Sequence, residues 1–139
     1  MTKPISILLF SLAAATCQVA CAIDLASNWT LEVRDLQKQQ QVLAKVRFSD
    51  KSASSCMAGT WKTLVVVAVL KQSGDSFPIT SPLAYTIQEG TLTLGRTQVC
   101  DGYLFLSGAE HPHHVSGDYR SVSIGSSVQI GTFTLQRSK

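Results

Sequence analysis

The residues with the clearest potential for chemistry are the three histidines, which lie together in one short segment. His111, His113 and His114 follow Glu110, and Pro112 stiffens their spacing. In an extended chain His111 and His113 point to the same side, and neutral imidazoles so arranged suit zinc or copper. The acidic residues that could add an oxygen ligand are Glu110, Asp101 and Asp118. The segment therefore predicts a zinc or copper site or, because Pro112 is typical of turns, an exposed polar loop.

The serines of the chain are not linked to a histidine and an acid by any catalytic motif. The sequence contains no Gly-x-Ser-x-Gly elbow and no glycine-rich phosphate loop before a helical pattern. Its nine Asp and Glu residues are scattered, as on a solvated surface. We therefore expect a protein that is not an enzyme.

Two aromatic residues lie close in sequence to cysteines and are candidate binding residues. Trp61 follows Cys56 by five positions, and Tyr103 follows Cys100 by three. A tryptophan there could line one mouth of a β-barrel. The alternative interpretation is core packing beside a disulfide, because tryptophan is usually largely buried.

Residues 1–22 have the three-part layout of a secretory signal peptide. Lys3 supplies the positive charge, residues 5–15 are mostly apolar, and Ala20-Cys21-Ala22 places small residues at the cleavage site. The apolar run is shorter than the roughly 20 residues that cross a bilayer. We therefore expect cleavage after Ala22 and a single periplasmic or secreted domain over residues 23–139.

Lipid attachment to Cys17 or Cys21 is the alternative means of export. An apolar run followed by small residues and a cysteine is typical of a lipoprotein signal. Neither cysteine fits well, because Gln18 stands three residues before Cys21 and Thr16 immediately precedes Cys17. The sequence thus favours complete removal of the signal peptide.

Cleavage after Ala22 leaves only two of the four cysteines, Cys56 and Cys100. Two thiols in an exported chain normally pair. The sequence has no Cys-x-x-Cys motif, and the spacing from Cys56 to Cys100 is not that of a zinc ribbon. We therefore predict one disulfide.

The overall composition is that of one folded domain. The 139 residues are 45% hydrophobic and 15% charged, which argues against disorder. The net charge is +3, and the basic residues form no cluster. Nucleic acid is therefore excluded as the expected partner.

Alternation of apolar and polar residues with period two dominates the mature chain. The segments that show it are 29–34, 42–48, 92–94, 99–107, 115–124 and 129–136. With the apolar run described next, the count is about eight strands, and no segment has a long amphipathic helical pattern. The predicted fold is therefore all-β and antiparallel, a small barrel of about eight strands, with a β-sandwich as the alternative.

The run from Leu64 to Leu70 is apolar without a break. Its four valines favour a strand over a helix. A strand without polar alternation is expected to be covered on both faces. It would lie either under a flap or in an oligomer interface.

The two ends of the chain resemble those of calycin barrels, the group that includes lipocalins, avidins and small bacterial proteinase inhibitors. Asn28-Trp29-Thr30 is similar to the Gly-x-Trp start of these barrels, with Asn28 in the place of glycine. Gly117-Asp118-Tyr119 and the stretch from Gly131 to Arg137 resemble the last hairpin, whose basic residue can cap the tryptophan. The resemblance implies a protein that binds rather than catalyses.

Three functions follow as hypotheses. The leading one is an exported binding protein, such as an inhibitor of a hydrolase, which contacts a macromolecule through an exposed edge or the loops at one mouth. The second is a carrier of a small apolar ligand inside the barrel. The third is metal binding by the histidines. The carrier hypothesis requires that the interior not be filled by the large apolar residues Trp29, Phe48, Val67 and Phe105.

Overall fold

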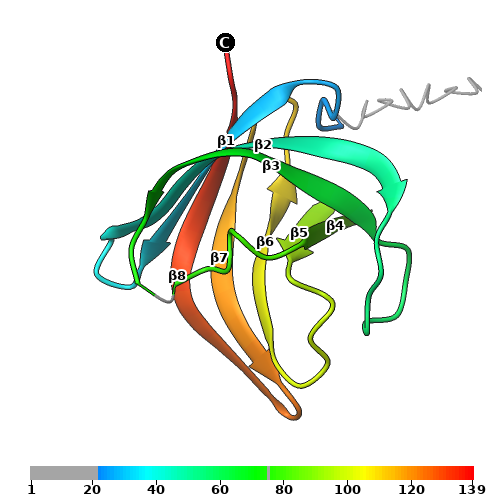
Figure 1. Ribbon diagram of the computed structural model, residues 1–139, viewed down its shortest axis with the longest axis vertical. Helices are drawn as coiled ribbons and strands as arrows, with labels where there is room; N and C mark the ends of the chain where they lie inside the picture. Colours follow the sequence, from blue (N-terminus) through cyan, green and yellow to red (C-terminus); the bar gives the residue numbers. More distant parts are fainter. Residues whose placement is uncertain (1–21, 75) are drawn as a thin grey trace, which may run out of the picture.

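The computed structural model describes residues 22–74 and 76–139, and these form a closed antiparallel barrel of eight strands (Figure 1). The predicted signal peptide, with Cys17 and Cys21, lies outside the described residues except for Ala22. Each strand pairs with its sequence neighbours, and β1 closes the barrel against β8. The strands are β1 (Asn28–Asp35), β2 (Gln40–Ser52), β3 (Lys62–Gln72), β4 (Leu83–Gln88), β5 (Thr91–Gly95), β6 (Tyr103–Glu110), β7 (His114–Ser123) and β8 (Ser126–Arg137). The prediction of a small barrel is confirmed, and the sandwich alternative is wrong.

The alternating residues of β1 and β2 form one wall of the core. Trp29, Leu31 and Val33 are completely buried, and the polar residues between them face outward. The same holds for β2, whose buried residues are Val42, Ala44, Val46 and Phe48. The period of two predicted from sequence is thus the physical basis of the barrel.

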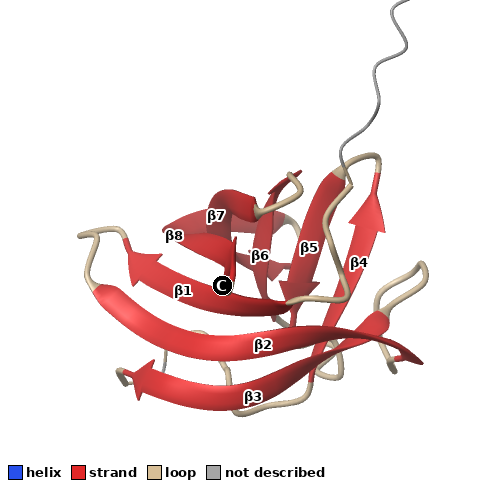
Figure 2. Ribbon diagram, turned by 90° about the horizontal axis from the view of Figure 1, so that it is seen from above, coloured by secondary structure: helices blue, strands red, loops and turns tan. Residues whose placement is uncertain are grey.

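The pairing of β3 with β4 is the weakest part of the barrel wall. It consists of three residue pairs, from Lys62↔Tyr85 to Leu64↔Leu83. Beyond these pairs the two strands diverge, as Figure 2 shows. The greater part of β3 therefore pairs with β2 alone.

The segment between β3 and β4 fills the interior at this gap with two apolar side chains. Phe77 and Ile79 are 0% and 1% exposed, and the ring of Phe77 lies edge-on to Tyr119 of β7, with centroids 5.8 Å apart. Packing between side chains, rather than strand pairing, therefore completes the core here.

The predicted strand over residues 99–107 begins later than expected. β6 starts at Tyr103, and residues 99–102 belong to a loop in which Val99 is exposed. Cys100 of this loop forms a disulfide with Cys56, with the Cα atoms 5.4 Å apart. The predicted disulfide is confirmed, and it is of the kind that an oxidising compartment allows. In the described part of the chain, no helix has the length and apolarity needed to span a membrane.

Candidate binding surface

The two predicted aromatic binding residues lie on the outer face of the barrel, on either side of Phe105. The ring of Trp61 stacks on Phe105 at a centroid distance of 6.0 Å, and Tyr103 stacks on the same ring at 5.2 Å. Phe105 lies opposite Gly95 on β5, where a Cβ atom would come within 2.7 Å of the Phe105 ring. The stack of Trp61, Phe105 and Tyr103, here called the aromatic column, thus depends on the absence of a side chain at Gly95.

The aromatic column is largely covered. Trp61 is 5% and Phe105 6% exposed, and the indole Nε1 of Trp61 donates a hydrogen bond to the carbonyl of Ala58 at 3.1 Å. Tyr103 is half-buried, and its hydroxyl donates to the carbonyl of Cys100 at 3.4 Å. These contacts favour packing beside the disulfide for Trp61, and a binding role for the two residues remains a prediction.

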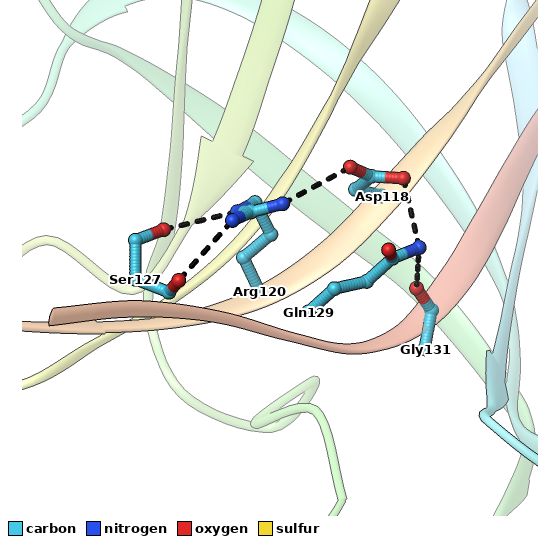
Figure 3. Close-up of polar contacts among 5 residues, drawn as sticks. All are labelled: Asp118, Arg120, Ser127, Gln129 and Gly131. Carbon is cyan, nitrogen blue, oxygen red and sulfur yellow. Dashed lines mark hydrogen bonds and ion pairs between the residues drawn. The ribbon is translucent and has the colours of Figure 1, made fainter.

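Beside Phe105, the outer face carries a polar cluster on β7 and β8 (Figure 3). Arg120, directly opposite Phe105, donates to the hydroxyl and carbonyl of Ser127 at 3.0 and 3.2 Å and forms an ion pair with Asp118 at 3.2 Å. Gln129 donates to the other oxygen of Asp118 at 2.9 Å. The guanidinium group of Arg120 therefore links β7 to β8 and stabilises the hairpin that these strands form.

The histidines are arranged differently from the expectation. His111 stacks on His114, with ring centroids 4.7 Å apart, whereas His111 and His113 were expected to share a side. Within residues 22–74 and 76–139, no three His, Cys, Asp or Glu side chains converge closely enough to hold a metal ion. The reason is that β6 ends at Glu110 and β7 begins at His114, so the intervening residues turn and the extended spacing does not apply.

The barrel interior contains some, but not all, of the residues expected there. Trp29 and Phe48 lie in the central core, with ring centroids 6.0 Å apart. Phe105 packs in the separate cluster on the outer face, and Val67 is 57% exposed. Residues from the connecting segment, Phe77 and Ile79, occupy interior space that a ligand would need.

The apolar run that was expected to be covered on both faces is instead exposed. In the half of β3 that follows its pairing with β4, Val67, Val69 and Leu70 are 57%, 41% and 56% exposed. The composition of β3 alone could not reveal this exposure, because the coverage of a strand depends on the length of its neighbour. The pairing of β3 with β4 ends at Leu64 of β3 and Leu83 of β4. The alternative that this strand forms an interface stays open.

The exposed part of β3 is also an open strand edge. Residues 65–72 pair with β2 on one side, while no hydrogen bond joins their other side to the described residues of the β3–β4 connection. Backbone N–H and C=O groups at such an edge are available to another strand. The edge therefore combines free backbone groups with exposed apolar side chains, which defines the candidate binding surface, here called the β3 edge (residues 65–72).

Two β-bulges make the β3 edge irregular. At each, β3 has one residue more than β2, and the extra residues are Val67 and Leu70. Bulges and edge lysines are features by which proteins limit indiscriminate strand pairing, and Lys71 follows the second bulge directly. The β3 edge is thus not a flat template for strand pairing.

Positive charge predominates around the β3 edge. β2 and β3 together carry five basic residues and one acidic residue, Asp50. Asp50 forms an ion pair with Lys62 at 2.8 Å, and the hydrogen bond and charge of each partner lower the pKa of the Asp50 carboxyl and raise that of the Lys62 amine. The remaining basic residues are Lys45, Arg47, Lys51 and Lys71.

Comparison of the chain with protein-family models, with curated proteins and with solved structures found no match. The functional argument therefore rests on the residues and geometry of this barrel.

Proposed function

We propose that the protein is an exported, non-enzymatic binding protein with a calycin-like barrel, and that it binds a protein partner through the β3 edge. The observation that carries the proposal is the unpaired edge of residues 65–72, with exposed Val67, Val69 and Leu70. An extended segment of another protein can add to such an edge as a further strand, with backbone hydrogen bonds giving affinity and side-chain contacts giving specificity.

The relationship to calycin barrels is supported by topology and by the first strand. The order β1 to β8 with closure of β1 on β8 is that of an up-and-down barrel. Trp29 near the start of β1 is completely buried in the interior, and Arg137 lies directly opposite on β8. These are the positions at which the sequence resembles the group.

Export is supported by two independent features. The first 22 residues have the layout of a cleavable signal peptide. The disulfide between Cys56 and Cys100 joins the loop before β3 to the loop before β6, and disulfides of this kind persist outside reducing compartments. A barrel cross-linked by a disulfide provides a rigid scaffold for a binding edge.

The test is photo-crosslinking from the β3 edge. A benzophenone amino acid at Val67 is expected to crosslink a specific extracellular or envelope protein, while the same group at Ile124 is not. Ile124 is the matched control because it is 98% exposed and lies between β7 and β8.

The crosslinked protein is then purified and added to the unmodified barrel. Amide hydrogen exchange is expected to slow at residues 65–72 and to remain unchanged in the β7–β8 turn. Equal crosslinking from both positions, or a partner that protects other strands only, would contradict the proposal.

A further inference from the structure

We infer that the partner of the β3 edge is an extended protein segment in which apolar residues alternate with acidic ones. This inference rests on the proposed function and adds the chemistry of the partner. It follows from which side chains of β3 face each side of the sheet and from the charges on β2.

The inner side of the β3 edge requires apolar contacts. Val69 pairs with buried Ala44 and therefore projects toward the core side of the sheet, yet it is 41% exposed. A strand added beside β3 would place every second side chain on this same side. Apolar side chains there would bury Val69 and extend the core across the gap between β3 and β4.

The outer side of the same edge requires negative charge. Lys71 projects outward beside the added strand, whose axis would lie about 4.8 Å away. The Nζ of Lys45 donates to Thr30 of β1 at 2.8 Å and so points away from β3. Arg47 pairs with Val65, whose short side chain leaves room for the long basic side chain to reach across β3. β3 itself contains no acidic residue, so acidic side chains on the incoming strand would meet uncompensated positive charge.

The same charges disfavour a second copy of this chain as the occupant. An antiparallel pair of β3 strands centred on Ala68 would place Lys71 of one copy opposite Val65 of the other. Val65 is the cross-strand neighbour of Arg47, so each Lys71 would approach an Arg47 of like charge. The bulges at Val67 and Leu70 further oppose flat self-pairing.

The experiment measures the binding of three labelled peptides of about ten residues to the oxidised barrel by fluorescence anisotropy. One alternates valine with glutamate, one alternates valine with lysine, and one has the sequence of residues 64–72. The glutamate peptide is expected to bind about tenfold or more tightly than the lysine peptide, which corresponds to about 1.4 kcal/mol or more.

Two variants and their controls connect binding to the β3 edge. Val69→Ser, which removes the apolar contact without adding charge, is expected to weaken binding of the glutamate peptide about tenfold or more, while Ile124→Ser leaves it unchanged. Lys71→Glu is expected to reverse the preference between the glutamate and lysine peptides, while Lys139→Glu does not. Circular dichroism checks that each variant keeps its sheet content.

The remaining outcomes distinguish failure of the acidic partner from failure of the proposed function. Equal affinity for the glutamate and lysine peptides, with crosslinking from Val67 intact, overturns the acidic partner and leaves the proposed function standing. Tightest binding of the 64–72 peptide, or a concentration-dependent dimer in sedimentation, identifies a second copy as the occupant. Failure of all three peptides to bind also overturns the inference, and if Val67 yields no crosslinked partner the proposed function falls with it.

Discussion

Trp29 on β1 and Arg137 on β8 lie directly opposite each other, and both are bound to Asp24. The indole Nε1 of Trp29 donates to the carbonyl of Asp24 at 3.0 Å. The guanidinium of Arg137 forms an ion pair with the Asp24 carboxylate at 3.1 Å. The segment before β1 thus ties the first and last strands together at the seam where the barrel closes.

Replacing Asp24 with Asn is expected to lower the thermal midpoint at neutral pH. The Ser27 hydroxyl is the main cause that lowers the pKa of Asp24 below 3.8, and Ala26 N–H and Arg137 add to it against the opposing effect of burial. Because the pKa is lower in the folded state, the stabilisation is present above 3.8 and disappears as the pH falls through the lowered value. Melting curves of wild type and Asp24→Asn should therefore differ at neutral pH and converge in strong acid. A difference that persists in strong acid would contradict this, and Asp101→Asn on an exposed loop is the control.

Replacing Phe77 with Ala is expected to destabilise the barrel by about 3–5 kcal/mol, and Ile79→Ala by about 2–5 kcal/mol. Both side chains are buried where strand pairing between β3 and β4 is missing, so truncation leaves a cavity that the sheet cannot close. Urea unfolding measures the loss. Thr80→Ala, at an exposed neighbour, should change stability by less than about 0.5 kcal/mol. A similar small effect for Phe77→Ala would show that the connection does not support the core.

Tyr119→Phe is expected to make the barrel more resistant to alkali. Burial raises the pKa of Tyr119 from 10.0 to about 12. Between these values the unfolded chain loses the phenolic proton while the folded chain keeps it, so stability falls as the pH rises through this window. The variant lacks this proton and should lose less stability between pH 10 and 12, as measured by urea unfolding at a series of pH values. Parallel pH curves for the two proteins would refute the assignment.

Much of this fold could be predicted because burial in β1 and β2 follows directly from alternation. The same reasoning failed at β3, where the apolar run indicated a strand but not its surroundings. Exposure there is set by the short pairing with β4 and by two bulges, and neither is encoded in the periodicity of β3 itself.

The candidate site was only partly predictable for related reasons. Trp61 and Tyr103 were singled out by their nearness to the cysteines, and the structure brings both onto Phe105. Phe77 and Ile79 were missed, although their alternation within a segment rich in serine and proline was a usable signal. The histidine spacing misled because it assumed an extended chain where the structure has a turn.

Removing the disulfide with the double variant Cys56→Ser, Cys100→Ser is expected to cost about 4 kcal/mol in the chain-entropy model. The two cysteines are 44 residues apart, so the bond restricts a long loop in the unfolded state. Loosening of the joined loops should also hydrate Trp61 and shift its fluorescence to longer wavelength. Reduction of the wild-type disulfide should reproduce both changes. A double variant as stable as the oxidised wild type would contradict the prediction.

The first residue of the expected mature chain lies against an acidic side chain at the end of β6. Ile23 is 7% exposed, and its backbone N–H donates to Oε2 of Glu110 at 3.5 Å. Cleavage after Ala22 would convert this N–H into an α-ammonium group, whose usual pKa is about 7.7–8.0. We expect the ion pair with Glu110 to make a chain that starts at Ile23 more stable than one that starts at Ala22, by up to about 1 kcal/mol.

This last prediction has a defined pH dependence. An amine that gains a carboxylate partner has a raised pKa in the folded state, so the added stability is complete below about 7.7 and is lost as the pH rises through the folded value. Thermal melts of the two chains should therefore differ most at neutral or mildly acidic pH and converge in alkali. Glu110→Gln should abolish the difference, whereas Glu89→Gln on the exposed β4–β5 turn should preserve it. An advantage of the Ile23 chain that survives Glu110→Gln would assign it to packing of the Ile23 side chain instead.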